Sequence, residues 1–467
     1  MHDDENGVPD PDSSKRQLSR RALLESSLLG GSVLLANPAI GGPGVAPATT
    51  AAQADAMATP GTVEQAAAQR LLSGRAWDDF CDSLRAAGHM IERWGNEPSD
   101  LERAEWYRFM TRLCRNGFER FVENCEPDRP RLRDASWRQS INFQSPDQDH
   151  LLTEFVDGSH EYRIIGQRGT VPYFVLGAWR AAQPADLGAR DWAPKGVAGL
   201  KEFDPAMLKT TAFLQSDAMQ FEPDGRFEII LSQKKHPGKN WLPLTPDSTG
   251  VLVRVVYHER HRETPPQMRI ERLDSAVPRP ITPAQMSEGL AKAGQVALAY
   301  AELVRSWWQD NLAKQPNQLR FSMATYLSNG GVADRQHGFG TWQRAPGQAL
   351  VLEFTPPACE YWIFQLCNRW QENLDNYEDG QGYVTKFTVR PATDGRVRIV
   401  IAERDPGIDA NWIDSYGHET GGMSLRLIKT TGVPKITAYL VDLEALIRRG
   451  WDALDPRTAI ISGERVP

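Results

Sequence analysis

Cysteine is scarce in this sequence: five cysteines are scattered over 467 residues. No two of them form a Cys-x-x-Cys pair, so neither a disulfide framework nor a zinc or thiol redox site is predicted, and buried free thiols are expected. The glycine-rich phosphate loop, the dinucleotide fingerprint and the nucleophile elbow are also missing, which argues against phosphoryl and hydride transfer. We therefore expect no metal and no cofactor.

Positive charge is not in excess either. The net charge is -7 and the isoelectric point is near 5.8. Nucleic-acid binding needs a basic face that neutralises phosphates, so we do not expect a nucleic-acid partner. No segment after the N-terminal region reaches about 18 consecutive apolar residues, and a transmembrane span is therefore not expected.

The first 54 residues have the composition of an export signal. Basic residues that end in Arg20 and Arg21 precede a weakly apolar stretch from Ser26 to Ile40, and an alanine-, proline- and glycine-rich tract follows. This order is typical of twin-arginine signals. We expect such a signal over 1–54, with the export machinery as a partner and a periplasmic or secreted location. The alternative is a disordered basic tail.

Three helices are predicted from their start signals. Thr62, Ser99 and Thr282 are each followed three residues later by Gln or Glu, which is the pattern of a capping box. After Thr282, apolar residues recur at helical spacing from Met286 to Trp307, so this helix should be long and packed along a core. Trp77 is expected to face the core from the first helix.

Two regions have the short β-branched and aromatic runs of sheet, and they repeat each other. The repeated features are Tyr173 to Leu176 and Tyr361 to Phe364; Asp-Gly-Arg at 224 and 394; Asn-Trp at 240 and 411; and strands that contain Arg254 and Arg426. Their order and separations match closely, which indicates duplication of one β module. We predict a mainly β fold with helical segments, α+β overall, built from two related β-sandwich or jelly-roll modules.

The expected domain organisation follows from these features. The export tract over 1–54 precedes a helical region over 55–156 and a first β module over 157–281. A long helix with a loop-rich connector occupies 282–344. The second β module, with a C-terminal helix, covers 345–467.

The second module also resembles a known family. The similarity lies in three stretches, Glu360 to Trp370, Arg404 to Gly407 and Asn411 to His418, and more loosely in Asp128 to Pro130 and Tyr162 to Gly169. These stretches resemble the bacterial domain-of-unknown-function family DUF1214. The resemblance implies a jelly-roll-like C-terminal module paired with an N-terminal β domain, and no established activity.

Candidate site residues come from the repeat. His236 and Asp405 occupy equivalent positions, each followed by Pro-Gly and then Asn-Trp. If the modules pack around a pseudo-twofold axis, these loops approach one cleft, where Asp405 and His418 are candidates for a general acid/base pair. The candidate ligand-binding residues are His236, Asn240, Trp241, Asn368, Trp370, Glu372, Asn411 and Trp412. The alternative is that Asp-Pro-Gly is an ordinary turn and Asn-Trp only anchors a loop.

Three functions remain open on this basis. The first is a metal-free hydrolase or lyase acting on a small hydrophobic or glycosidic substrate at an inter-module cleft. The second is a non-catalytic protein that binds a carbohydrate or lipid-like ligand through tryptophans, with Asn368 to Glu372 as a cleft wall. The third is a structural or assembly protein. The sequence does not set the oligomeric state.

Overall fold

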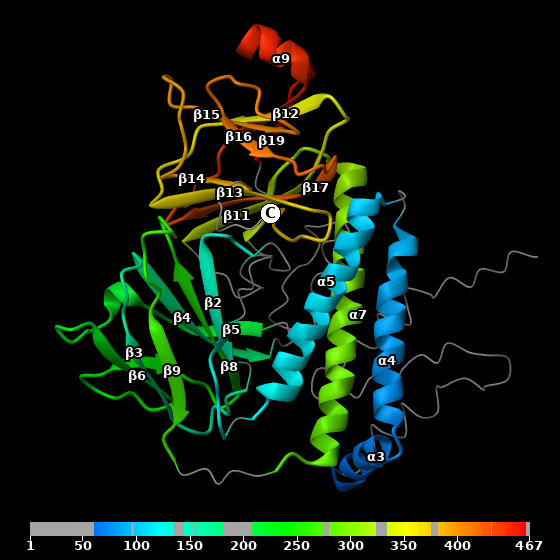
Figure 1. Cartoon of the computed structure of the whole chain (residues 1–467). Coiled ribbons are helices and arrows are strands. Elements are labelled where there is room, and N and C mark those ends of the chain that lie inside the picture. The colour runs from blue at the N-terminus through cyan, green and yellow to red at the C-terminus, as the bar shows by residue number, and fades with distance from the viewer. Residues whose placement is uncertain are drawn as a thin grey trace, which may run out of the picture.

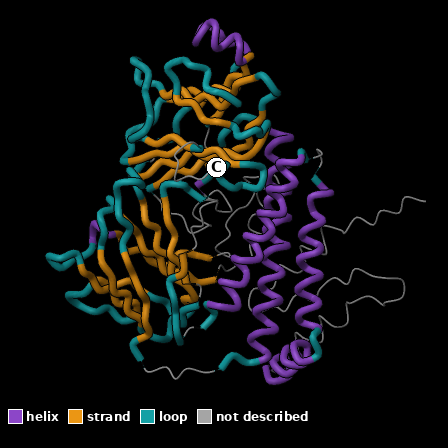
Figure 2. Tube along the Cα trace, viewed as in Figure 1, coloured by secondary structure: helices purple, strands orange, loops and turns teal. Residues whose placement is uncertain are grey.

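A computed structural model describes residues 60–94, 98–126, 128–134, 144–153, 155–181, 208–274, 280–323, 334–374, 382–430 and 432–463. The expected export signal over 1–54 lies outside these residues. Helices gather on one side of the molecule, and the strands form two bodies beside them (Figures 1 and 2). Among the described residues, no helix is both long and apolar enough to span a bilayer.

The helical side is a bundle around one long helix. Its members are α3 (Pro60–Leu72), α4 (Arg75–Gly88), α5 (Asp100–Phe118) and α7 (Pro283–Lys314), and a π-helical turn over Glu119–Glu123 extends α5. The helices α3, α4 and α5 all pack on α7, as Figure 1 shows. The capping boxes predicted at Ser99 and Thr282 are confirmed, and both helices begin where these side chains bind the free backbone N–H groups.

Two expectations for the first helix were wrong. The helix begins at Pro60, so Thr62 lies inside the first turn rather than at its cap, because proline favours the first helical position. Gly74, with φ of 80°, then ends this helix and starts α4. Trp77 is 55% exposed, since the buried stripe of α4 includes Ala76 and Phe80, and Trp77 is rotated away from it.

The first β module consists of two antiparallel-rich sheets packed face to face. One sheet has the order β1-β2-β8-β4-β5 and the other β7-β6-β3-β9. The strands are β1 (Arg133–Asp134), β2 (Gln148–Thr153), β3 (Tyr162–Gln167), β4 (Tyr173–Ala181), β5 (Leu208–Gln215), β6 (Arg226–Ser232), β7 (Asn240–Pro243), β8 (Ser248–Val256) and β9 (Gln267–Arg272).

The second β module has the same architecture. Its sheets have the orders β10-β11-β17-β13-β14 and β16-β15-β12-β18-β19. The strands are β10 (Arg320–Phe321), β11 (Arg335–Gln343), β12 (Gln348–Phe354), β13 (Tyr361–Cys367), β14 (Tyr383–Thr385), β15 (Val397–Ala402), β16 (Asn411–Asp414), β17 (Thr420–Ile428), β18 (Ile436–Asp442) and β19 (Ile460–Ser462). A short helix, α9 (Leu443–Arg449), follows β18.

The two strand orders correspond one to one, apart from the additional β19. In each module the strand before the Asn-Trp pair runs parallel to the strand that begins with it, β6 with β7 and β15 with β16. A parallel pair in an otherwise antiparallel module is a specific feature, and its occurrence in both modules confirms the predicted repeat. The predicted fold class is therefore confirmed.

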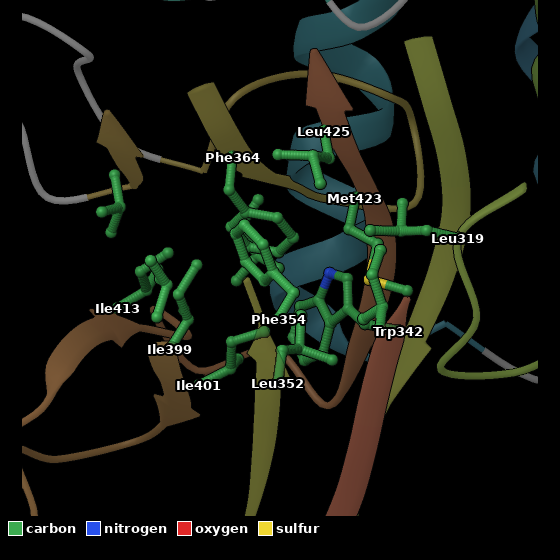
Figure 3. Close-up of a cluster of buried hydrophobic side chains, with 14 of the residues drawn as sticks. Leu319, Trp342, Leu352, Phe354, Phe364, Ile399, Ile401, Ile413, Met423 and Leu425 are labelled. Atoms are coloured by element: carbon green, nitrogen blue, oxygen red, sulfur yellow. The ribbon is translucent and has the colours of Figure 1, made fainter. Parts of the chain in front are cut away.

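Each module has its own apolar core between its two sheets. In the second module, Trp342, Phe364 and Leu425 of one sheet meet Leu352 and Ile399 of the other (Figure 3). Alternate residues of the strands supply these side chains, because successive side chains of a strand point to opposite faces. The intervening residues face away from the core and are available for other contacts.

In each module, one sheet includes strands that lie outside the module limits expected from the sequence. The strands β1 and β2 belong to the first module, although the sequence placed 55–156 in the helical region. Likewise, β10 and β11 belong to the second module rather than to the connector over 282–344. Only the pairing with β8 and β17 reveals their membership, and that pairing is long-range.

Candidate functional site

The Asn-Trp pair anchors a loop in each module. Asn240 Oδ1 accepts a hydrogen bond from Gln220 N at 2.8 Å, and its Nδ2 donates to the backbone oxygens of Gln220 and Glu228, both at 2.9 Å. Asn411 makes the same three bonds in the second module, at 2.7 to 3.0 Å. The amide group therefore pins the loop to the strand, and it is occupied by backbone groups.

The indole rings of the two Asn-Trp pairs also bind backbone groups. Trp241 Nε1 donates to the backbone oxygen of Ser232, and Trp412 Nε1 donates to that of Ala402, each at 3.2 Å. Both rings lie at the parallel strand pair of their sheet. Their contacts are those of the loop anchor that the sequence offered as the alternative.

His236 and Asp405 lie in equivalent loops, but the two loops belong to different ends of the molecule. His236 Nε2 is 3.3 Å from Glu161 Oε1, and Asp405 Oδ1 accepts from Gly407 N at 2.9 Å. These loops follow β6 and β15, whereas the buried cluster that the two modules share belongs to the other sheet of each module. Figure 1 shows β6 and β15 on opposite sides of that contact.

The other predicted residues do come together, against α5. Asn368 Nδ2 donates to Glu105 Oε2 at 3.1 Å, and His418 Nε2 is 3.3 Å from Glu105 Oε1. Arg112 pairs with Glu372, and Arg369 pairs with Glu102. We call these seven residues the helix clamp: Glu102, Glu105, Arg112, Asn368, Arg369, Glu372 and His418. His418 thus contacts Glu105, and Asp405 has a different partner.

Tryptophans enclose the helix clamp. The ring of Trp370 lies 4.4 Å from that of Trp94 and 4.8 Å from that of Trp106, measured between centroids. The guanidinium of Arg369 lies 4.7 Å from the centroid of Trp308, a cation–π distance. All of these side chains are buried. The helix clamp therefore joins the bundle to the second module, and Trp370 forms part of a core.

Burial has a strong electrostatic effect within the helix clamp. The side chain of Glu372 is fully buried, which raises the pKa of its carboxyl group from 4.5 to about 7 although Arg112 acts in the opposite direction. For Arg369, burial lowers the pKa of the guanidinium, and Glu102 opposes that change. These are the effects of a charged network held in a low-dielectric core.

A second polar group lies where the modules meet. The sheets containing β4 and β13, hereafter the inner sheets, contact each other through equivalent residues. Tyr173 begins β4 and pairs with Val256 on the neighbouring strand of its own sheet. Tyr361 begins β13 and pairs in the same way with Ile428. All four belong to one buried cluster. A contact built from the same positions on both sides is the pattern of a twofold dimer interface, here within one chain.

An arginine and a histidine lie opposite each other on this same face in both modules. Arg254 of β8 pairs with His150 of β2, and Arg426 of β17 pairs with His337 of β11. The neighbours of both arginines along the strand belong to the module cores, so the arginines point away from those cores. We call His150, Arg254, His337 and Arg426 the junction quartet; all four are partly buried.

Arg426 is held by a chain of polar groups that reaches the first module. Its Nη1 donates to Ser424 Oγ at 3.0 Å and to Gln365 Oε1. Gln365 Nε2 donates to Asn373 Oδ1 at 2.9 Å and to the backbone oxygen of Gln144 at 3.0 Å. Gln144 precedes β2, so the side chain that orients Arg426 also ties the two modules together.

Arg254 has a different setting. Its guanidinium lies 5.9 Å from the ring centroid of Trp179. The cross-strand pair Gly177 and Leu252 occupies the position that Gln365 and Ser424 hold in the second module. At these two equivalent positions the residues are therefore polar beside Arg426 and apolar beside Arg254.

Burial and nearby arginines lower the pKa values of both histidines of the quartet, and His150 is affected by arginines of both modules. Burial lowers the pKa of His150 well below its usual value, and Arg254 and Arg426 lower it further. Burial and then Arg426 do the same to the pKa of His337. Both imidazoles are therefore neutral near neutral pH. Burial also raises the pKa of Asp147, although Arg426 opposes this.

Arg254 and Arg426 were recognisable from the sequence as repeated features without a role, and neither histidine was predicted. Part of the signal was present in the sequence, because the side chain of a charged residue between two core residues of a strand points to the opposite face of the sheet. The cross-strand partners could not be identified without the register. Within the described ranges, no group of three or more Cys, His, Asp or Glu residues is placed to hold a metal ion.

The fold defines a protein of two internally repeated β modules with a helical bundle. A family model described as "Protein of unknown function (DUF1214)" matches residues 201–259 and 346–432, one segment in each module. The crystal structure of an uncharacterised protein from Burkholderia cenocepacia is 32% identical, with a TM-score of 0.72 over 81% of this chain and 100% of that chain. The chain belongs to the DUF1214 family.

A second solved structure is more distant. The VPA0106 protein from Vibrio parahaemolyticus is 12% identical over 77% of this chain and 98% of that chain, with a TM-score of 0.37, too low to support an argument. No curated protein matches the chain. The resemblance expected for the C-terminal module is thus confirmed, and the family match also includes part of the first module.

Proposed function

We propose that this protein binds a small organic anion between its two β modules, with Arg254 and Arg426 as the anion-binding groups. The observation that carries the proposal is the junction quartet: the same arginine–histidine pair occurs in both modules, on the inner sheets, away from either core. Neither module core includes this residue pair, and the pair is repeated on the two sheet faces that meet. Its position therefore suits a role at the contact between the modules.

The chemistry of the quartet fits an anion. A guanidinium presents a planar fork of donors that matches a carboxylate or phosphate, and it remains charged at any physiological pH. Ser424 and Gln365 hold Arg426 in place, which reduces the entropy lost when a ligand binds. Neutral imidazoles beside the arginines can accept or donate one hydrogen bond each.

The surroundings favour an anion that also has an apolar part. Tyr173 and Leu252 share the face of the first inner sheet with Arg254, and the guanidinium of Arg254 lies 5.9 Å from the ring centroid of Trp179. Aromatic surface beside a few fixed polar groups is typical of residues that bind small molecules. These surroundings support the second of the hypotheses drawn from the sequence, a non-catalytic binding protein, but with an organic anion in place of a carbohydrate or lipid-like ligand.

The test is a thermal-shift comparison of carboxylates with neutral molecules of the same shape, on the whole chain. A carboxylate such as hexanoate or benzoate should stabilise the fold by about 2.7 kcal/mol at roughly 100 times its Kd, whereas hexanol or benzamide should not. Arg426→Gln should abolish the shift. Arg396→Gln is the matched control, because Arg396 is an exposed arginine of the second module that pairs with Asp394.

Two results contradict this proposal. Equal shifts with the acid and with its neutral analogue show that charge is not recognised. An unchanged shift in Arg426→Gln places the site elsewhere.

Catalysis by Asp405 and His418 has less support. Asp405 accepts a hydrogen bond from Gly407 N within a turn, and His418 lies beside Glu105 and is 3% exposed. A general acid/base pair must reach one bound atom, and these two have separate partners. Asp405→Asn separates the alternatives, because it should leave anion binding intact, whereas an enzyme that depends on this carboxylate loses turnover.

We also propose export by the twin-arginine route, on the basis of Arg20 and Arg21 and the apolar stretch that follows them. Replacement of both arginines by lysine should retain the protein in the cytoplasm of an expressing bacterium, as measured by cell fractionation. Equal amounts of wild-type and variant protein outside the cytoplasm would argue against this route.

A further inference from the structure

We infer that the contact between the two β modules is sensitive to acid, because it holds the ring of His258 in surroundings that suit only the neutral imidazole. A proton gained by this ring loosens the contact. This regulatory property is separate from the proposed anion binding, and neither depends on the other.

The first step is the position of His258 between the modules. The residue lies in the loop that follows β8 of the first module. Its ring stacks on Tyr361, which begins β13 of the second module, with the centroids 5.2 Å apart and the planes at 15°. It also stacks on Phe387, which follows β14 of the second module, at 4.4 Å and 30°. One histidine ring thus bridges the two modules.

The second step concerns hydrogen bonding. Nε2 of His258 is buried, and no group among the described residues forms a hydrogen bond with it. A neutral imidazole carries one N–H, and Nε2 can be the nitrogen without it, whereas an imidazolium carries an N–H on both nitrogens. Protonation therefore buries a charged donor that has no acceptor, which costs more than leaving a neutral nitrogen unpaired.

The third step is the balance of charges around the ring. The charged groups that face His258 are Asp147, Glu263, Glu360 and Lys386. Burial has the largest effect and lowers the pKa of His258 below its ordinary value of 6.5. The three carboxylates act in the opposite direction, and Lys386 acts in the same direction as burial. The neutral ring is therefore the form that the contact favours.

The carboxylates do not offset burial because each has another partner or a reduced charge. Glu263 accepts a hydrogen bond from the backbone N of His258 at 2.9 Å, and Glu360 pairs with Lys429 at 2.7 Å. Neither carboxylate forms an ion pair with the imidazole. Burial raises the pKa of Asp147 and so opposes its ionisation.

The direction of the pH dependence follows from the lowered pKa. A solvated ring in a loosened contact has the ordinary value of 6.5, and the ring in the intact contact has a lower one. The stability that this group gives the contact is fully present above about pH 6.5 and is lost as the pH falls through the lower value. Phe387 is 50% exposed, so protons reach this edge of the junction without unfolding of either core.

The two histidines of the junction quartet respond to acid in the same direction. Burial, Arg254 and Arg426 lower the pKa of His150, and burial and Arg426 lower that of His337. A proton on either ring adds positive charge near an arginine. The experiment must therefore separate the contribution of His258 from that of these two residues.

The experiment is hydroxyl-radical footprinting of the full chain, read by mass spectrometry. Tyr361 is 0% exposed, so it is labelled only when the contact loosens. Its labelling should rise several-fold between about pH 7.5 and about pH 5.5, with a limit of about 10-fold per pH unit for each histidine that titrates. Tyr162, equally buried in the first module core, should stay protected. A parallel rise at Tyr162 overturns the inference, because it shows that the module itself unfolds.

The variant that isolates the ring is His258→Phe, which keeps an aromatic side chain between Tyr361 and Phe387 but cannot gain a proton. The rise in Tyr361 labelling on acidification should be at least about twofold smaller in this variant than in wild type. His89→Phe is the matched control, because His89 is an exposed histidine of the bundle that lies beside Glu92. This control should keep the wild-type response. An equal rise in wild type and in His258→Phe overturns the inference.

A second measurement uses the wild-type protein. Nuclear magnetic resonance follows the imidazole signal of His258 across pH, assigned by its absence from the His258→Phe spectrum. If that variant does not fold, His258→Gln, which is also neutral, takes its place. The pKa of His258 should lie below 6.5. A value at or above 6.5 overturns the inference, whatever the outcome of the anion-binding tests.

Discussion

Replacement of Glu372 by glutamine isolates one titration in the middle of the molecule. The side chain is fully buried, pairs with Arg112 of α5, and lies 3.4 Å from Asn368 Nδ2. Glutamine keeps the shape of glutamate and can still accept from Asn368, but it has no proton to lose. The cost of leaving Arg112 without its carboxylate is the same at every pH, so it cancels when the wild-type and variant proteins are compared across pH values.

The expected size follows from the pKa. Burial raises it from 4.5 in the unfolded chain to about 7 in the fold. Because the folded-state value is the higher one, the stability that this group contributes is fully present below about pH 4.5 and is lost as the pH rises through about 7. At ~1.36 kcal/mol for each pKa unit, the loss is roughly 3 kcal/mol.

The assay is urea unfolding at about pH 5 and about pH 8, followed by tryptophan emission. Trp94, Trp106 and Trp370 surround the helix clamp, so their emission reports on this part of the structure. Because about pH 5 already lies above the unfolded-state pKa of 4.5, the variant should gain roughly 2.5 kcal/mol of unfolding free energy relative to wild type between the two pH values. Glu444→Gln, at an exposed pair with Arg404, controls for the removal of a carboxylate. A wild-type-to-variant difference that is the same at both pH values refutes the reasoning.

Four further substitutions test the packing. Asn411→Ala removes three hydrogen bonds to the backbone and should destabilise the second module by about 2–3 kcal/mol, measured as a lower urea midpoint; an unchanged midpoint would show that the loop holds without its anchor. Gly340→Ala places a Cβ 1.9 Å from a backbone oxygen and should prevent stable folding, whereas Gly88→Ala, with open space around it, should add about 0.5–1 kcal/mol. Arg369→Met leaves buried Glu102 without its ion-pair partner and should cost about 3–5 kcal/mol, with loss of the near-ultraviolet dichroism of the tryptophans; a native spectrum and midpoint would contradict a role in the helix clamp.

The parts of the fold that could be predicted from sequence are those encoded by neighbouring residues. The capping boxes at Ser99 and Thr282 depend on a side chain and a backbone group three residues apart. The repeat was visible because each Asn-Trp pair is needed where a loop returns to its own strand. Asn240 and Asn411 make the same three bonds, so the same residue recurs at the same distance from its turn.

The arrangement of the modules could not be predicted in this way. A pseudo-twofold relation was considered, but which pair of sheets would meet is decided by side chains on faces that periodicity alone does not distinguish. The candidate loops at His236 and Asp405 therefore came from the outer sheets, while the contact is made by the inner ones. His418 was assigned to Asp405 because the two are close in sequence, whereas its partner, Glu105, lies on a helix more than half the chain away.

Internal duplication itself separates the residues that serve the fold from those that serve the junction. A feature that each module needs in order to fold must occur in both, on a side that faces its own core or its own loops, as the two asparagine anchors do. The paired arginine and histidine occur in both modules but point away from both cores, which is why we propose a shared role for them at the contact between the modules. The residues around them then differ, with Gln365 and Ser424 on one side and Gly177 and Leu252 on the other. A site formed by two copies of one module begins with two identical halves, and only changes of this kind allow it to distinguish one end of a ligand from the other.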